Sequence, residues 1–548
     1  RRQLRVFLRK DIYGRFLNAL VYVPRDRYNT ELRMKMQEIL MSACNGTSSE
    51  FNVQFSQLVL ARVNFTIQIA DPKQSPTIDA EDIQRKMQDA MSSWEDKLLN
   101  ALHKSHGEES GNILFNDYVP YLPAAYREDF SPNAAVLDIE RLGQLGDEGD
   151  ISTHIYRQVG QTKNNYFFKV YGAGTTLILS DVLPILECMG LRVLEARPYE
   201  LDQNGDGSAN TWVVEFAISV DADVNLEKNS QREAFQDAFN QVFSRRVEND
   251  RFNALVLSAS LTWRQVTMLR ALTKYLMQLQ VPFSVQYMQQ TLEKNAGIAR
   301  LLVQLFEQRF DPSQETKRGE KVQKILDKIA AELDQVANLD EDRILKHYLS
   351  VIQAMLRTNF YQAGVEGEVK DYVSFKLDPS LIPAVPLPRL KFEVFVYAPW
   401  VEGIHMRGGK VARGGLRWSD RMEDFRTEVL GLVKAQMVKN AVIVPSGAKG
   451  GFVAKQLKKN ASREEVQAEV IRCYTTFISG LLDITDNLVQ NAVVPPLSVL
   501  RYDEDDPYLV VAADKGTATF SDLANSISAK YGFWLGDAFA SGGSNGYD

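Results

Sequence analysis

Cysteine is scarce in this sequence of 548 residues, which contains only Cys44, Cys188 and Cys473. Three cysteines so far apart cannot build a disulfide framework, and they argue against a cysteine-rich metal site. His103 and His106 lie near a predicted helix end in a polar context, which does not indicate a metal site either. We therefore expect no bound metal and, from the cysteine usage, a cytoplasmic protein.

The chain also lacks a surplus of basic residues and any long hydrophobic run. Its formal net charge is −7 at pH 7, so no basic face for nucleic acid or an anionic membrane is expected. No apolar run approaches the length that spans a bilayer, and the sequence opens without the pattern of a signal peptide. Neither a nucleic-acid partner nor a membrane partner is predicted.

The length of the chain predicts several domains, because single hydrophobic cores stop growing near about 250–300 residues. Alternating strand patterns and helical periodicities predict a multidomain α/β and α+β fold. The predicted parts are an α+β module at 1–75, a helical connector at 76–150, a second α+β module at 151–225, a helical region at 226–365 and an α/β domain at 366–548.

The first module shows strand-like alternation on both sides of one predicted helix. Strands are expected at 4–8, 16–23 and 63–69, and the helix begins after a cap at Asn29 or Thr30.

Residues 78–104 predict a single charged amphipathic helix, and the segment 143–150, rich in Gly, Asp and Glu, predicts a linker.

The second module combines strands with a helix that ends at a glycine. Strands are predicted at 166–170, 191–195 and 212–218, and Ser180 is expected to cap a helix that Gly190 terminates. This order is similar to the ACT regulatory module, which commonly binds amino acids where modules meet. A purely structural spacer is the alternative, and the first module resembles either an ACT or a PAS module.

The region from 226 to 360 is predicted to be mostly helical. Thr262 and Gln265 form a capping box, residues 311–318 break the helical pattern, and residues 321–357 resume it. We expect a scaffold that links the regulatory and catalytic parts, with contacts between subunits.

Residues 411–453 are the stretch that packing explains least well. Gly414 and Gly415 lie between Arg413 and Arg417, and a helix is predicted over 421–440. An apolar strand at 441–444 and a tight turn at 445–451 follow, with Lys449 held among glycines. Such a lysine could bring an amine against a small anionic substrate, although a solvated turn lysine is the alternative.

The helical period sorts the polar residues of the predicted helix. Gln436 falls on the apolar stripe and Lys439 beside it, whereas Lys434 lies on the opposite face and is expected in solvent. Burying an ammonium is costly unless it is paired, so a bound carboxylate would suit Lys439. The alternative is that Lys439 extends out of the crowded face. Arg417 is expected to form a structural ion pair with Asp420 or Asp424, and a role as a carboxylate ligand is the alternative.

Three segments in order carry a resemblance to a known family. RGGLRW, AQMVK and PSGAKGG resemble the substrate-domain signature of the glutamate dehydrogenase superfamily, and more closely that of the large bacterial NAD-dependent glutamate dehydrogenases. The likeness is dense from 391 to 548. A phosphate-binding loop fits less well, because two glycines follow the lysine where a P-loop has Ser or Thr at a helix start.

The resemblance implies a role for each matching residue. Lys449 stands at the catalytic lysine and Asp514 at the catalytic aspartate, while Gln436 and Lys439 match the residues that hold the substrate α-carboxylate. Arg413, followed by Gly414 and Gly415, stands where smaller relatives use lysine for the distal carboxylate. Arginine binds carboxylate in a bidentate fork, so this position favours a dicarboxylate such as glutamate or 2-oxoglutarate.

The cofactor and partners also follow from the resemblance. NAD is implied, but no stretch has the strand, glycine turn and helix of a dinucleotide site, and the glycines at 541–546 lack that context. We therefore expect a fragment whose nucleotide-binding domain lies beyond it. Amino-acid effectors and a homo-oligomer, tetrameric or hexameric, are also expected. The alternatives are a regulatory or oligomerisation module and a dehydrogenase for another amino acid.

A first prediction concerns the isolated chain. We expect it to fold and hold substrate weakly, but not to oxidise NADH in the presence of 2-oxoglutarate and ammonium, because hydride transfer needs a nicotinamide site. NADH absorbance measured with the purified 548-residue chain checks this. Robust turnover would show that the nucleotide site lies within these residues.

Overall fold

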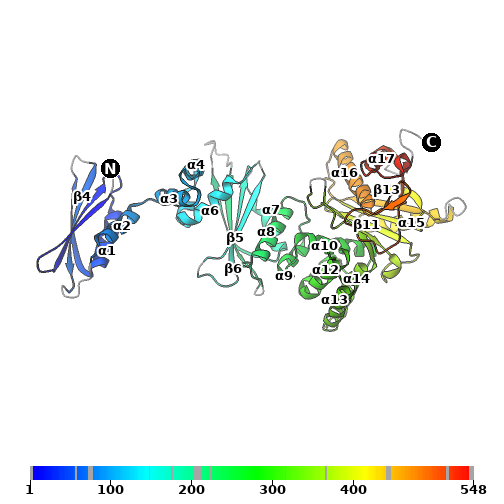
Figure 1. Ribbon diagram of the computed structural model, residues 1–548, viewed down its shortest axis with the longest axis horizontal. Coiled ribbons are helices and arrows are strands. Elements are labelled where there is room, and N and C mark those ends of the chain that lie inside the picture. The colour runs from blue at the N-terminus through cyan, green and yellow to red at the C-terminus, as the bar shows by residue number, and fades with distance from the viewer. Residues whose placement is uncertain are drawn as a thin grey trace. The chain divides into compact units, whose positions relative to one another are not determined.

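The computed structural model describes residues 4–55, 59–71, 78–146, 149–158, 160–174, 177–201, 211–221, 224–314, 316–364, 367–439, 446–513 and 518–541, with backbone only at 437–439, 513 and 518. Two compact units are present. The first comprises residues 1–152, 171–176 and 198–214, and the second comprises residues 153–170, 177–197 and 215–548. Figure 1 shows both units as mixtures of helix and sheet.

The first α+β module is an antiparallel sheet with helices on one face. Its strands are β1 (Arg5–Lys10), β2 (Phe16–Pro24), β3 (Gly46–Phe55) and β4 (Leu60–Ile69), in the order β1-β2-β4-β3. Helices α1 (Thr30–Cys44) and α2 (Ala80–Met91) share its core. Of the two predicted caps, Asn29 is the one observed. Its side chain accepts a hydrogen bond from the Leu32 amide at 2.7 Å. The edge strand β3 was not expected, because most of its side chains are exposed.

The predicted single helix over 78–104 is two helices. After α2 ends, α3 (Trp94–His106) starts anew, because Ser93 and Asp96 form a reciprocal capping box with both hydrogen bonds at 3.1 Å. Helices α4 (Glu108–Tyr118), α5 (Ala124–Asp129) and α6 (Pro132–Gly143) follow. Buried Asp138 joins them to the next sheet, since it accepts hydrogen bonds from Tyr126 and, at 2.7 Å, from Tyr171.

The second module contains the predicted strands, and one predicted cap is wrong. Its elements are β5 (Ile151–Tyr156), β6 (Asn165–Ala173), α7 (Leu179–Cys188), β7 (Arg192–Leu201) and β8 (Thr211–Ser219), with the sheet order β5-β6-β8-β7. Ser180 lies inside α7, whose start has no side-chain cap. Gly190 does terminate the helix, with a φ of +83°, and the Leu191 amide donates to the Leu186 carbonyl at 3.0 Å.

The helical region ends differently from the prediction. Its helices are α8 (Asn229–Phe243), α9 (Leu255–Ser258), α10 (Trp263–Gln278), α11 (Val285–Lys294), α12 (Ala296–Phe310), α13 (Arg318–Leu333) and α14 (Leu339–Ala354). Thr262 and Gln265 form the expected capping box before α10. However, the helix predicted over 321–357 breaks between α13 and α14, where Asn338 caps α14, and it ends at Ala354. Residues 355–358 instead form strand β9 (Met355–Thr358), because Arg357 is bound by carboxylates of a distant loop.

An eight-stranded mixed sheet forms the centre of the C-terminal part. Its order is β18-β17-β13-β14-β12-β11-β10-β9. The strands not yet introduced are β10 (Val373–Leu377), β11 (Phe392–Ala398), β12 (Val401–Arg407), β13 (Arg413–Trp418), β14 (Ala448–Ala454), β17 (Val510–Ala513) and β18 (Ala540–Ser541). The pairs β13–β14, β13–β17 and β17–β18 are parallel, whereas β9 to β12 and the β12–β14 pair are antiparallel.

Helices cover both faces of this sheet. On one face, α16 (Arg463–Leu482) and α17 (Ser521–Lys530) bury Phe452, Phe477 and Val396. On the other face, α10 places Tyr275 against Phe395, with ring centroids 5.5 Å apart, and α15 (Phe425–Lys439) covers Gly451 with Val429. Successive residues of a strand point to opposite faces, so β11 and β14 each serve both cores.

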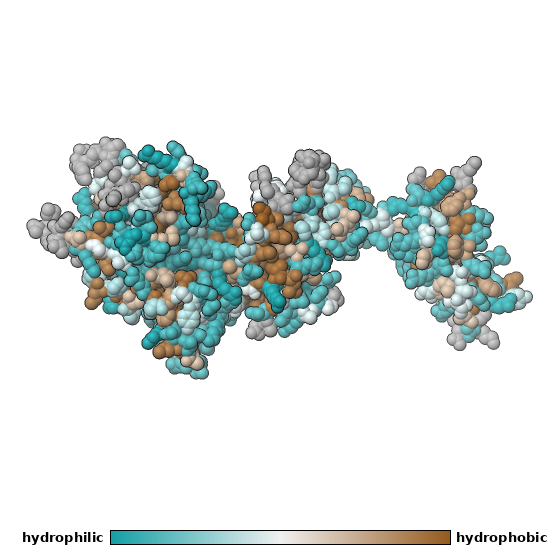
Figure 2. Space-filling view, turned by 180° about the vertical axis from the view of Figure 1, so that it is seen from behind, coloured by the Kyte–Doolittle hydropathy of each residue, from teal (hydrophilic) through white to brown (hydrophobic). Residues whose placement is uncertain are grey.

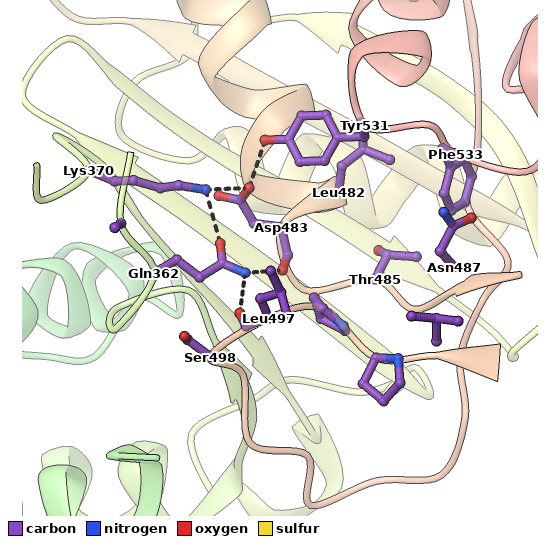
Figure 3. A pocket seen from close by; sticks show the side chains of 14 residues that line it. Gln362, Lys370, Leu482, Asp483, Thr485, Asn487, Leu497, Ser498, Tyr531 and Phe533 are labelled. Carbon is purple, nitrogen blue, oxygen red and sulfur yellow. Dashed lines mark hydrogen bonds and ion pairs between the residues drawn. The ribbon is translucent and has the colours of Figure 1, made fainter. Parts of the chain in front are cut away.

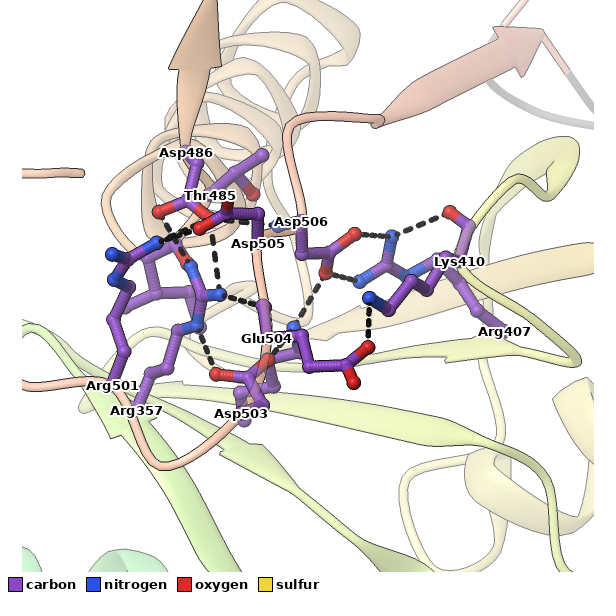
Figure 4. Close-up of polar contacts among 12 residues, drawn as sticks. Arg357, Arg407, Lys410, Thr485, Asp486, Arg501, Asp503, Glu504, Asp505 and Asp506 are labelled. Carbon is purple, nitrogen blue, oxygen red and sulfur yellow. Dashed lines mark hydrogen bonds and ion pairs between the residues drawn. The ribbon is translucent and has the colours of Figure 1, made fainter. Parts of the chain in front are cut away.

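A buried ion network fixes the loop that precedes β17 (Figure 4). Lys376 binds both Asp503 and Asp506, Arg407 binds Asp506, and Arg357 binds Asp486 at 2.9 Å and Asp503 at 2.6 Å. The side chains of these six residues are at most 7% exposed. Removing one charged side chain of such a network leaves its partner's charge buried and unpaired, so each member stabilises the position of the loop.

The network generates a prediction about stability and pH. Burial disfavours the Asp506 carboxylate, but Arg407 and Lys376 outweigh burial and lower its pKa from 3.8 to about 2. A carboxyl group whose pKa is lower in the folded state stabilises that state at pH values above its pKa in the unfolded state. This stabilisation is lost as the pH falls through the pKa of the folded state. Asp506→Asn should therefore cost about 3–5 kcal/mol of unfolding free energy at pH 7, and the cost should shrink between pH ~4 and ~2.

Urea unfolding followed by fluorescence at several pH values measures this cost. The matched control is Asp505→Asn, since the Asp505 side chain is 59% exposed and pairs with Arg501 at the surface. That substitution should cost less than about 1 kcal/mol. Equal costs for the two variants would contradict a special role for the buried carboxylate.

Candidate functional site

The candidate site lies where two parallel strands and a helix come together. Strand β13 pairs with β14 in a register that places Leu416 opposite Gly450, and a bridge joins Arg413 to Gly447. Helix α15 packs over this pair and carries Gln436 near its end. Arg413, Gln436 and Lys449, which are separate in sequence, are therefore brought to the same edge of the sheet.

Gly414 allows the two strands to approach closely. A Cβ atom at Gly414 would lie 1.4 Å from the carbonyl oxygen of Ala448, where no side chain can fit. Gly447 also lies close to the helix, because its Cβ atom would be 3.2 Å from Cγ of Gln436. The glycines predicted here thus serve backbone packing, and they are not required by a left-handed conformation.

The predicted tight turn at 445–451 is wrong over most of its length. Residues 448–451 are the first part of strand β14, so Lys449 projects from the start of a strand and pairs in register with Met406. The turn was expected from the glycines, but Gly450 and Gly451 instead give room to Leu416 and Val429, whose side chains would meet a Cβ atom at 2.4 and 2.6 Å. The strand predicted at 441–444 lies outside the described residues.

Gln436 holds Arg413 in place. Its Nε2 atom donates a hydrogen bond to the Arg413 carbonyl oxygen at 3.0 Å. Its buried Oε1 atom has no hydrogen-bond partner among the residues that the structure describes. An amide has two N–H groups and an accepting oxygen, so Gln436 retains one donor and one acceptor for a ligand at this edge.

Two predicted site residues are incompletely described. Lys439 belongs to α15, but its side chain lies outside the described atoms, and Asp514 lies outside the described residues altogether. The strand before Asp514 is well placed, because β17 pairs with β13 and sets Ala513 opposite Leu416. Lys434 is exposed on α15, as predicted from the helical period.

Buried ion pairs anchor α15, and the sequence did not reveal their partners. Arg426 is 1% exposed and binds Glu393 of β11 through two nitrogens, while the Tyr275 hydroxyl donates to the same carboxylate at 2.9 Å. Arg417 pairs with Glu428 at 2.9 Å, so the expected partners Asp420 and Asp424 were wrong. Asp424 instead pairs with Arg421, three residues earlier in the turn before α15.

The described part of the chain contains no group of three His, Cys, Asp or Glu side chains that could hold a metal ion. None of its described helices is both long enough and apolar enough to cross a bilayer.

The chain matches five family models that together cover most of its length. The match at 328–548 is to the catalytic domain of bacterial NAD-glutamate dehydrogenase. Residues 5–95 and 150–231 match the ACT2 and ACT3 domains of glutamate dehydrogenase, and residues 101–145 and 247–312 match its helical motifs 2 and 3. These matches confirm the expected fold class, with ACT modules, helical segments and a catalytic domain.

Curated relatives give the same assignment. The chain is 52% identical over 552 residues to the NAD-specific glutamate dehydrogenase of Pseudomonas aeruginosa and 48% identical over 548 residues to that of Halomonas elongata. It is 42% identical over 576 residues to the Mycobacterium tuberculosis protein of the same name. Each alignment includes the whole chain but only 34% or 35% of the relative, so the chain spans about a third of their length.

The close strand approach can be tested by adding one methyl group. Gly414→Ala places a Cβ atom against the Ala448 carbonyl, so the strands must separate. We expect the unfolding free energy to fall by about 1–3 kcal/mol or more, as measured by denaturant titration. Gly431→Ala is the control, because nothing lies within 4 Å of its Cβ position on α15. That change should stabilise the protein by about 0.4–1 kcal/mol. A stable Gly414→Ala variant would show that the strands need not touch.

Proposed function

Because this chain belongs to the family of bacterial NAD-specific glutamate dehydrogenases, we propose that the protein oxidises L-glutamate reversibly to 2-oxoglutarate and ammonium with NAD. The observation that carries the proposal is the edge formed by β13, β14 and α15, which gathers Arg413, Gln436 and Lys449. The chain covers about a third of its relatives, so this activity is assigned to the full-length polypeptide.

Substrate binding at this edge follows from the chemistry of its side chains. The Arg413 guanidinium offers a fork of donors for the distal carboxylate of a dicarboxylate. Gln436 and Lys439 hold the α-carboxylate, for which Gln436 has an N–H group left after positioning Arg413. Two carboxylate sites at opposite ends select glutamate over amino acids with apolar side chains.

The chemical step requires general acid and base groups near the substrate α-carbon. When bound, NAD would supply the acceptor for the hydride that leaves Cα, and no residue of this chain is assigned to its binding. The resulting imine adds water and then releases ammonium, which moves protons at both nitrogen and oxygen. Lys449 activates the water and Asp514 transfers protons to and from the amino group. Lys449 lies on a strand, so its Cα is held more rigidly than a turn residue would be.

Regulation and assembly are the second part of the proposal. The ACT matches support amino-acid effectors at the N-terminal modules. Figure 2 shows a brown, hydrophobic area on the middle part of the chain, which carries β5 to β8, and Ile178 and Leu194 in this part are 58% and 52% exposed. Exposed apolar side chains of this kind support contacts between modules in a homo-oligomer. The tetrameric or hexameric state and the cytoplasmic location are proposed from the family resemblance and the cysteine usage.

Substituting the proposed catalytic lysine tests the assignment. In the full-length polypeptide, Lys449→Ala should lower NADH oxidation with 2-oxoglutarate and ammonium by about 10²–10⁴-fold, because a general acid–base group is lost. Circular dichroism should show that the variant folds.

The control for this experiment is Lys434→Ala, which removes an exposed lysine from the same region and should leave the rate unchanged. Activity that survives in Lys449→Ala would move catalysis to another residue. Inactivity of the unmodified protein with every 2-oxo acid would favour a regulatory module instead.

A further inference from the structure

A pocket of about 500 Å³ lies away from the candidate site (Figure 3). Its walls come from the segment after β9, the end of α16, the hairpin of β15 (Asn487–Val489) and β16 (Ala492–Val494), and the turn after α17. None of Arg413, Gln436 and Lys449 lines it. A volume of this size is typical of small-molecule sites.

The centre of the pocket wall is a carboxylate that is fully occupied. Asp483 is 2% exposed, and its Oδ1 atom accepts hydrogen bonds from Lys370 at 2.6 Å and from Tyr531 at 2.7 Å. Its Oδ2 atom accepts from Asn359 at 2.8 Å and from Tyr372 at 2.9 Å. With two donors on each oxygen, Asp483 has little capacity to bind a further cation or donor.

The Lys370 ammonium, in contrast, retains a hydrogen. It uses one for Asp483 and one for the Gln362 Oε1 atom at 2.9 Å, out of the three that an ammonium carries. Its side chain is 15% exposed while that of Asp483 is 1% exposed, so the accessible charge is positive. The pocket therefore presents an ammonium to a ligand, although the wall as a whole is neutral.

The other polar groups of the wall are largely occupied. The Gln362 amide donates to the carbonyl oxygens of Asp483 and Leu497, at 2.9 and 3.0 Å. Asn487 donates to Gly532 and accepts from two backbone amides, and the Thr485 hydroxyl donates to Leu481. Among the described residues no hydrogen bond is found for the Ser498 hydroxyl, and in Figure 3 it lies on the same side as Lys370 and Gln362.

The remaining wall is apolar. Val494, Pro495, Pro496 and Leu497 form one continuous segment of it, and Phe533 lies on the side opposite Lys370 in Figure 3. A ligand that fits must combine one anionic group with an apolar body. A dicarboxylate would leave its second charge against this apolar surface, and a phosphate would need more donors than Lys370 and Ser498 provide.

We propose that this pocket binds a small monocarboxylic acid, with its carboxylate on Lys370 and Ser498 and its apolar body against the 494–497 segment. The site is separate from the proposed glutamate site and does not depend on that assignment. The bound acid would contact the start of the loop that the ion network of Figure 4 fixes before β17.

Isothermal titration calorimetry on the 548-residue chain tests the proposal. The probes are 4-methylpentanoate and 3-phenylpropanoate, each compared with its uncharged amide. We expect saturable binding of the acids, and binding of the amides at least about tenfold weaker, since a hydrogen bond to a charged group is lost. Lys370→Met should weaken acid binding by a similar factor. Equal binding of acid and amide, or no saturable binding of either acid, would overturn the proposal.

A second pair of variants avoids the buried polar cluster, which Lys370→Met could disturb. Leu497 is 86% exposed at the pocket, so its side chain can change without loss of packing. Leu497→Glu should weaken acid binding by charge repulsion, and Leu497→Lys should preserve or strengthen it. Leu387 is 78% exposed and does not line the pocket, so Leu387→Glu and Leu387→Lys should leave acid binding unchanged.

One further variant locates the bound acid. Lys449→Ala should leave binding of the probe acids unchanged, because Lys449 does not line this pocket. Binding that is lost in Lys449→Ala and retained in Lys370→Met and Leu497→Glu would place the acid at the candidate substrate site and overturn the proposal.

Discussion

The contact between the backbones of β13 and β14 at Gly414 is the constraint on which the candidate site depends. A glycine here lets the Ala448 carbonyl lie where a side chain would otherwise be. The Arg413 backbone then lies within reach of Gln436, and Lys449 lies one residue before Gly450, which pairs with Leu416 of β13. If the strands were further apart, these groups could not act together on one small substrate, whatever their chemistry.

Buried charges hold the elements around this contact in position. Arg426 and Glu393 attach α15 to the sheet, and the carboxylates of the 503–506 loop attach the approach to β17. Such pairs contribute less net stability than apolar packing, because both charges must leave water. They do restrict geometry, however, since a buried charge has few alternative partners. A site whose residues come from separate elements benefits from this restriction.

The 495–509 segment runs from the pocket of Lys370 and Asp483, through the buried ion network, to strand β17. Its beginning lines the pocket of Lys370 and Asp483, its middle belongs to the ion network, and its end becomes β17, which leads to Asp514. A ligand in the pocket would contact residues 495–498, while Asp503 and Asp506 keep the middle of the same segment bound to the sheet. This arrangement offers a physical route between the proposed acid-binding pocket and Asp514, the proposed catalytic aspartate.

The sequence by itself determined the local elements and the family. The capping residues Asn29, Thr262 and Gly190 act through neighbours a few positions away, so a sequence pattern is enough to identify them. The motifs around Arg413, Gln436 and Lys449 likewise specify the family, because their order along the chain is preserved.

Only the tertiary structure decided features that depend on partners distant in sequence. Arg357 belongs to a strand and not to the preceding helix because its partners are Asp486 and Asp503. Lys449 lies in a strand because β12 and β13 flank it on either side. The pocket of Lys370 draws its walls from segments more than a hundred residues apart, and no periodicity in the sequence records such a meeting.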